Sequence, residues 1–485
     1  MDSLSKPSHG GPLPNTTFLT KKLHSLLICL LNFSTILFSF STEAFLILRK
    51  WDLSFHALWL FCFLLFFFLN HYYFSKPQPV YLVDFSCLKP PSYCRIPFSA
   101  FISHAQKFFD EESVLSMAKV LSSSGQGEET YLPPALHSIP PRSNHHESTK
   151  EAEMVLFPVL DNLLSKTNLS PQEIDILIVN CSGFCPVPSL SSIIVNHYSM
   201  RDDIKTFTLS GMGCSASALA IDMAQNLLKV HQNSNAVILS TEILSTGWYP
   251  GKEKSMLAIN CLFRMGSSGI LLSNRKEMRN KAKYKLLHSL RSQRAADDKG
   301  YYSAFREEDS EGITGFTLRR DLLQVAGEVL RSNITAIGPL VLPAREILRN
   351  LASKVWKRFI DKSVEIYMPN FRSVIQHYGL PASGRSVIRE IGKGLRLGER
   401  EMEPALATLH RFGNQSSSSL WYELAYLEAK ERVKKGDKVW QLGMGSGPKC
   451  NSLVWKCLRA IVGEAQKGPW DDCIDRYPNL VVGRG

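Results

Sequence analysis

IKTFTLSGMGCSASALAIDMAQNLLKV, residues 204–230, predicts a strand, a sharp turn and a helix in direct succession. We expect the strand to end at Leu209 and the helix to begin near Ser215, because apolar residues then recur at helical spacing. The residues that share one face of this helix are Ala220, Met223, Ala224, Leu227 and Leu228. Cys214 therefore falls where the helix begins.

The position of Cys214 predicts a nucleophile. Unpaired N–H groups and the positive dipole end of a helix favour a thiolate, which is the form that attacks a carbonyl carbon. Gly211 and Gly213 permit a sharp backbone turn that leaves the sulfur accessible. The motif by itself leaves open the alternative of a thiol that only packs.

Short apolar runs on both sides of this stretch predict further strands. IDILIVN at 174–180, AVILST at 236–241 and SGILLSN at 268–274 are typical of strands buried on both faces. Because helical segments lie between them, we expect an α/β fold in which strands and helices are layered. A basic, helix-rich stretch over 321–361 separates an N-terminal half from a C-terminal half.

The N-terminal region differs from the rest of the chain. Residues 1–20 are polar and predict a disordered tail. Two apolar runs follow, at 26–48 and 53–74, and each has the length of a bilayer span. We therefore predict two transmembrane helices over 24–76, joined by a short turn, and a globular domain after residue 77.

Charge and cysteine usage narrow the possible partners. The net charge of +12 suits nucleic acid, an anionic membrane surface or anionic substrates such as CoA thioesters, and does not choose among them. The 11 cysteines form no CxxC pair, which favours a reducing compartment over a disulfide framework. Cys181 and Cys185 lack histidines at zinc-ligand spacing, so we expect free thiols and no metal site.

Long strings of the chain resemble one family of enzymes. They are GMGCSAS at 211–217, STEILSTGWYPGKEKSMLAINCLFRMG at 240–266, TLHRFGNQSSSSLWYELAYLEAK at 408–430 and KKGDKVWQLGMGSGPKCNSLVW at 434–455. Each is similar to plant-type 3-ketoacyl-CoA synthases, the condensing enzymes of very-long-chain fatty acid elongation. The tandem apolar runs near the N-terminus also resemble that family.

The resemblance implies a fold and a reaction. The fold is a thiolase-like, five-layered αβαβα arrangement of two related halves, 77–369 with the nucleophile and 370–470, followed by a tail at 471–485. In the reaction, Cys214 takes an acyl group from a long-chain acyl-CoA. Malonyl-CoA then loses carbon dioxide, and its carbanion attacks the thioester to give a 3-ketoacyl-CoA two carbons longer. The reaction needs no cofactor.

The resemblance also implies a location and partners. We expect the endoplasmic reticulum membrane, with membrane lipid around the N-terminal helices and the large domain in the cytosol. A homodimer, or a heterodimer with related synthases, and contact with other elongase subunits are expected. No nucleic acid partner is expected.

Hydrogen-bond donors for the enolate and the oxyanion are supplied in this family by an asparagine and a histidine. Asn414, in HRFGN, matches the asparagine, although it could instead cap the helix predicted near Ser419. His410 matches another family histidine, for which positioning and direct chemistry are both open.

The catalytic histidine is where the sequence departs from the family. The family pattern resembles HFCIHAGGRAVID, and here residues 377–389 read HYGLPASGRSVIR, which puts Pro381 in its place. Proline has neither a side-chain donor nor a backbone N–H. His377 matches the other, noncatalytic histidine of this motif. Gln293 and Pro448 are further departures, at positions where the family has a histidine and an aromatic residue.

Three functional hypotheses remain at this point. The first is a condensing enzyme, supported by Cys214 and Asn414 and weakened by Pro381. The second is a catalytically weak or inactive paralogue that regulates an active synthase or the elongase complex. The third, a chalcone-synthase-like polyketide enzyme, shares the cysteine but does not account for the apolar N-terminal runs.

Overall fold

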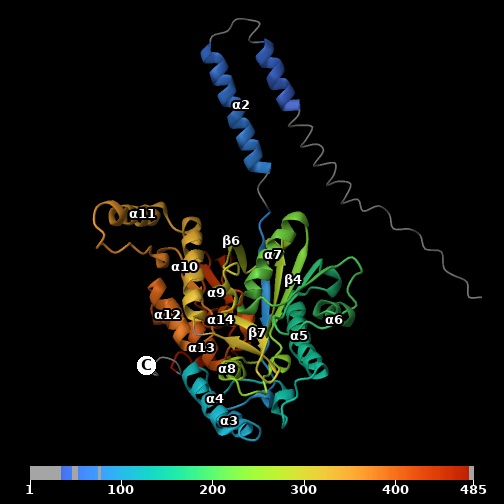
Figure 1. The fold of residues 1–485 in the computed structure, drawn as a ribbon. Helices are drawn as coiled ribbons and strands as arrows, with labels where there is room; N and C mark the ends of the chain where they lie inside the picture. The colour runs from blue at the N-terminus through green and yellow to red at the C-terminus, as the bar shows by residue number, and fades with distance from the viewer. Residues whose placement is uncertain (1–33, 46–52, 75–77, 320, 480–485) are drawn as a thin grey trace, which may run out of the picture. The chain divides into compact units, whose positions relative to one another are not determined.

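The computed structural model describes residues 34–45, 53–74, 78–319 and 321–479, which belong to two separate units, 1–77 and 78–485 (Figure 1). In the first unit, residues 34–45 are helical and α2 spans Leu53–Phe74. His56 Nδ1 lies 3.0 Å from Glu43 Oε1 and links these two helices.

In the described ranges, no helix combines the length and the apolar character that a bilayer span requires. The predicted pair of transmembrane helices is therefore not supported, and its residues 24–33 and 46–52 lie outside the described ranges, as does the tail predicted at 1–20.

A nine-stranded mixed sheet forms the centre of the second unit, in the order β3-β2-β4-β5-β1-β6-β11-β10-β9. Neighbours are parallel in β3-β2-β4 and in β10-β9, and antiparallel elsewhere. The strands are β1 Tyr81–Cys87, β2 Ile176–Asn180, β3 Lys205–Leu209, β4 Asn235–Thr241, β5 Ser267–Ser273, β6 Tyr284–Gln293, β9 His377–Gly379, β10 Lys438–Gly445 and β11 Lys449–Cys457. A hairpin of β7 Ala304–Glu308 and β8 Thr314–Leu318 stands apart. The apolar runs that predicted strands are β2, β4 and β5, so those predictions are confirmed.

The sheet consists of two related halves. The order β2-β4-β5-β1 has one parallel pair followed by two antiparallel pairs, and β9-β10-β11-β6 repeats that pattern in the same chain order. A short contact between β1 and β6 joins the halves. The predicted boundary at 369 does not coincide with this division, because β6 precedes it and pairs within the second half.

Three apolar clusters separate the layers. The first lies between one sheet face and α5 (His145–Thr167), and the third lies between the second half and α10 (Leu322–Val341), α12 (Arg385–Leu395) and α13 (Glu399–Phe412). The middle cluster holds α7 (Ala216–Val230) and α14 (Ser419–Ala429) between the halves. Figure 1 shows α5 and α6 on one side of this unit and α10, α12 and α13 on the other. The layering agrees with the predicted αβαβα fold.

The remaining helices are α3 Phe98–Ala105, α4 Glu111–Ser124, α6 Leu190–His197, α8 Lys254–Leu262, α9 Asp298–Tyr301 and α11 Ala344–Phe359.

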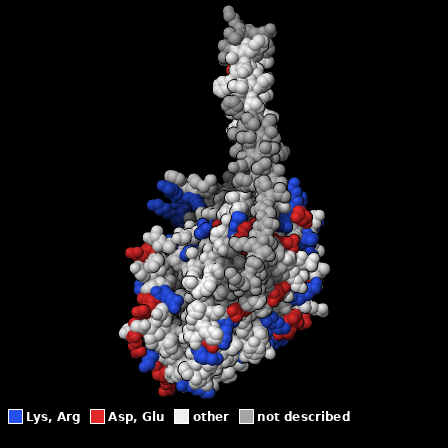
Figure 2. Space-filling model, turned by 90° about the vertical axis from the view of Figure 1, so that its right-hand side faces the viewer, with Lys and Arg blue, Asp and Glu red and all other residues white. Residues whose placement is uncertain are grey.

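The C-terminal segment after residue 470 packs against the first cluster, since Cys473, Ile474 and Tyr477 are buried there. The tail predicted at 471–485 is thus folded over its described part, because apolar side chains anchor it. Over one face of the unit, charges of both signs are interspersed (Figure 2).

Candidate active site

The predicted strand, turn and helix around Cys214 are confirmed as β3, a short 3₁₀ turn over Gly213–Ser215 and α7. Gly213 has φ of 61°, and a Cβ there would lie 2.6 Å from the backbone nitrogen of Ser446. The loop that follows β10 therefore closes directly on the turn. A side chain at 213 would push the two segments apart.

Cys214 lies beside two polar side chains that come from distant parts of the chain. The Ser416 hydroxyl is 3.5 Å from Cys214 Sγ and 3.1 Å from Glu242 Oε2. Burial raises the pKa of Cys214 to about 11, the Ser416 hydroxyl opposes this rise, and the nearby Glu242 adds to it. Desolvation therefore opposes the thiolate that a helix start would favour, and a pKa of about 11 corresponds to the thiol form at neutral pH.

Glu242 is held in place by backbone donors. The N–H groups of Ser182 and Gly183 donate to Oε1 over 3.1 and 2.8 Å. Burial raises the pKa of this carboxyl above its ordinary value. Because the Ser416 hydroxyl carries a single proton, it donates either to Cys214 or to Glu242 at one time, which couples the protonation of those two groups.

Sequence reasoning missed Glu242 and Ser416 as site residues. Both lie in strings that identified the family, but 174 residues separate them and no spacing pattern relates them. The serine run 416–419 reads as a polar loop, whereas all four serines are buried. The Ser417 hydroxyl donates to Asn180 Oδ1 over 2.8 Å, away from Cys214.

Asn414 is brought to the site through Ser416. Its Oδ1 accepts the Ser416 backbone N–H over 2.8 Å, and its backbone oxygen accepts the Arg264 N–H over 2.9 Å. The side chain therefore caps the short turn over Ser416–Ser418 and not α14 itself. Capping occupies only the oxygen, so the Nδ2 amide is still able to donate to a reacting group.

The two candidate histidines have hydrogen-bond partners other than Cys214. His410 Nδ1 lies 2.8 Å from the Tyr477 hydroxyl, and its ring packs on Gly127. His377 Nε2 lies 2.9 Å from Asp437 Oδ2, and burial lowers the pKa of this imidazole.

Strand direction explains the placement of His377. It sits opposite Val439 in β10, whereas Gly445, six residues later in the same strand, packs against Ser215. Six residues of strand span about 20 Å. His377 therefore lies toward the end of the sheet away from Ser215, beside Asp437, which agrees with its match to the noncatalytic histidine of the motif.

Pro381 lies at the other end of β9. β9 and β10 are parallel, and Gly379 pairs with Gln441. The chain after β9 therefore runs in the same direction as β10 toward Gly443, which packs against Ser215. Pro381 is buried there. The position expected for the catalytic histidine thus lies at the Cys214 end of the strand, and its occupant has no donor.

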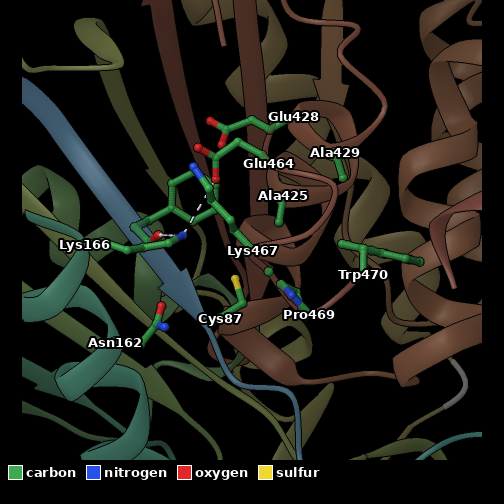
Figure 3. Close-up of a pocket in the computed structure, with 12 residues that line it drawn as sticks. Cys87, Asn162, Lys166, Ala425, Glu428, Ala429, Glu464, Lys467, Pro469 and Trp470 are labelled. Carbon is green, nitrogen blue, oxygen red and sulfur yellow. Dashed lines mark hydrogen bonds and ion pairs between the residues drawn. The ribbon is translucent and has the colours of Figure 1, made fainter. Parts of the chain in front are cut away.

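A small pocket of about 20 Å³ lies elsewhere, where Lys166 from α5 points toward Glu464 (Figure 3). Lys166 Nζ is 3.8 Å from Glu464 Oε2 and donates to the Phe85 carbonyl over 3.3 Å. The pocket has room for about one water molecule, which is too little for a substrate. We interpret the Lys166–Glu464 contact as an ion pair that stabilises the fold.

Across the described ranges, no group of three His, Cys, Asp or Glu side chains is placed to hold a metal ion.

Comparisons with known proteins agree with this architecture. Residues 72–359 match the family described as FAE1/Type III polyketide synthase-like protein, and residues 373–457 match the 3-oxoacyl-[acyl-carrier-protein (ACP)] synthase III C-terminal family. Among solved structures, the 1,3,6,8-tetrahydroxynaphthalene synthase of Streptomyces coelicolor A3(2) superposes with a TM-score of 0.60 at 16% identity, over 78% of this chain and 100% of that one. The likeness shows that the fold is that of type III polyketide synthases.

Curated relatives are much closer in sequence. The chain is 50% identical to 3-ketoacyl-CoA synthase 6 of Arabidopsis thaliana over 440 residues, which cover 90% of this chain and 88% of the relative. It is also 50% identical to 3-ketoacyl-CoA synthase 5 of the same plant over 434 residues, covering 89% and 88%. With Cys214 at the turn before α7 and both halves matched, the chain belongs to the 3-ketoacyl-CoA synthase family.

Proposed function

We propose that this protein condenses a long-chain acyl-CoA with malonyl-CoA in very-long-chain fatty acid elongation, and that its condensation step is slow. In the loading step, the Cys214 thiol loses its proton and Sγ attacks the acyl thioester, which releases CoA as its thiol. In the condensation step, malonyl-CoA loses carbon dioxide and its carbanion displaces Sγ from the acyl group. The products are a 3-ketoacyl-CoA and the free thiol.

The Cys214–Ser416 contact is the observation that carries this proposal. A hydroxyl within reach of Sγ stabilises the thiolate as it forms, although burial disfavours that charge. Asn414, whose Oδ1 accepts the Ser416 backbone N–H, has an amide nitrogen that is able to donate to the carbanion. The Ser416 hydroxyl supports acyl loading, and this step does not require a histidine.

Pro381 supports the slow condensation. The carbanion formed from malonyl-CoA needs a donor, and losing one preorganised donor costs about 10²- to 10³-fold in rate. The buried proline supplies none. This same observation favours a second candidate function, a paralogue that loads an acyl group and regulates an active synthase without turnover.

The proposed location is the endoplasmic reticulum membrane, with the 78–485 unit in the cytosol. The exposed apolar side chains of α2, among them Phe61 and Phe68 at 62% and 65% exposure, support attachment through this region. We further propose a homodimer or a heterodimer with related synthases, in contact with other elongase subunits. Deleting residues 1–76 should move much of the protein into the soluble fraction, and a full-length chain that is soluble without detergent would contradict the attachment.

The two half-reactions test the function directly. Full-length protein in membranes is given long-chain acyl-CoA, and peptide mass mapping locates the acyl group. We expect it at Cys214, and Cys214→Ser should abolish it. Acyl groups mainly on Cys185 would overturn the assignment of the nucleophile.

Labelled malonyl-CoA then measures condensation, with Pro381→His as the comparison. We expect loading with slow elongation in the unmodified protein. Elongation as fast as in a histidine-bearing relative would refute the role given to Pro381, and loading with no elongation at all would select the regulatory paralogue.

A further inference from the structure

Helix α11 (Ala344–Phe359) packs Ile347 against the third apolar cluster and presents its other large apolar side chains away from the protein. Its large apolar side chains, here named the α11 apolar face, are strongly exposed. They are Leu348 at 63%, Leu351 at 56%, Val355 at 48%, Trp356 at 51% and Phe359 at 74%. The spacing of three to four residues puts them on one side of the helix. No residue of α11 is buried.

Apart from Ile347, the side of α11 that faces the protein makes polar contacts. Glu346 Oε2 accepts hydrogen bonds from the Tyr367 hydroxyl over 2.8 Å and from the Asn370 N–H over 2.9 Å. Asn350 Nδ2 donates to the Tyr367 carbonyl over 2.6 Å, and Ser353 Oγ accepts the Tyr367 N–H over 2.9 Å. A surface helix of a globular protein normally has the reverse orientation. The polar contacts hold α11 with its apolar face turned outward.

Basic residues flank this apolar face. They are Arg345, Arg349, Lys354, Lys357, Arg358 and, just past the helix, Lys362, while Glu346 and Asp361 are the acidic residues between 344 and 362. Glu346 is engaged by Tyr367 and Asn370, and Asp361 by Ser363. An apolar stripe between basic rows is the pattern of a helix that lies in a membrane interface.

We infer that α11 lies on an anionic bilayer surface, with the α11 apolar face inserted among the acyl chains and its basic residues at the lipid headgroups. The charge of α11 favours an anionic bilayer over a second copy of the chain as the surface that covers the α11 apolar face. A symmetric contact between two α11 helices would bring their basic rows together, which is unfavourable, whereas anionic lipid neutralises them. The contact would place the body of the enzyme against the membrane independently of the N-terminal region.

Hydrogen–deuterium exchange tests the contact locally in the full-length protein. The protein is reconstituted in vesicles of phosphatidylcholine alone or of phosphatidylcholine with phosphatidylserine. We expect the α11 amides to exchange more slowly by about tenfold or more in the anionic vesicles, and high salt should reduce the protection. Because the N-terminal region is present in both samples, its own attachment cannot produce this difference.

Variants separate the α11 face from other apolar surface. Leu351→Glu and Arg358→Glu should each abolish most of the protection, whereas Leu115→Glu, on α4 and 71% exposed, should leave it unchanged. Equal exchange of α11 in detergent and in anionic vesicles would overturn the inference. Protection that needs no anionic lipid and grows with protein concentration would also overturn it, in favour of a contact between copies.

Discussion

Removing the Ser416 hydroxyl should slow every reaction that begins with the Cys214 thiolate. In the resting protein the pKa of Cys214 is about 11, so about one thiol in 10³ is ionised at pH 8. Ser416 offers its hydroxyl to the sulfur over 3.5 Å. A hydrogen bond to a charged group is worth about 1.5–3 kcal/mol, so Ser416→Ala should reduce thiolate reactivity by about 10- to 100-fold.

Alkylation with iodoacetamide measures this directly, since it reacts with the thiolate and needs no CoA substrate. The full-length protein in detergent is sampled with time, and the peptide that contains Cys214 is quantified by mass spectrometry. In the unmodified protein the rate should rise about tenfold for each pH unit from pH 7 to pH 10, because the thiolate fraction grows that way below the pKa of about 11.

Ser417→Ala is the matched control. Its hydroxyl is equally buried and donates to Asn180 Oδ1, with no contact to the sulfur, so the alkylation rate at Cys214 should change by less than about threefold. Two results would refute the reasoning. One is a rate that levels off below pH 8, and the other is a Ser416→Ala rate that equals that of the control.

Three further substitutions test other parts of the site. Glu242→Gln should speed alkylation of Cys214 at a given pH above neutrality, because the carboxylate raises the pKa of the thiol, and a slower rate would contradict that sign. Gly213→Ala should lower the melting temperature more than Gly211→Ala, since both glycines have positive φ but only the Cβ at 213 meets backbone; equal losses would refute this account of the turn. Asn414→Ala should reduce malonyl-CoA decarboxylation by about 10²-fold and affect acyl loading less, so an equal loss of both would assign Asn414 to the turn alone.

The strand, turn and helix around Cys214 were predictable because all their determinants are local. Glycine at 211 and 213 and apolar residues at helical spacing act within a few turns of chain, and the structure has β3, the turn and α7 at those residues. The buried strands β2 and β4 were equally predictable from the sequence. A continuous apolar run indicates a strand buried on both faces, and residues of both strands lie in the first and the middle apolar clusters. Sequence resemblance also predicted the family and its layered fold.

The division of the sheet into its two halves and the packing of the C-terminal segment could not be predicted from the sequence. Tyr477 looks like part of a polar tail, and it is buried only because the first apolar cluster lies beside it. β6 likewise joins the second half through its pairing with β11, more than 150 residues later. Pairing of distant strands depends on the whole hydrophobic arrangement, which a local pattern does not contain.

The chemistry of the site was decided by tertiary structure. The local sequence pattern predicted Cys214 at a helix start, and the family resemblance predicted that Pro381 takes the place of a donor. Only the fold sets Ser416 and Glu242 beside the sulfur and leaves His377 at the far end of its strand with Asp437. The reason is that a pKa depends on desolvation and on charges within a few ångströms, and those neighbours come from segments that folding alone brings together.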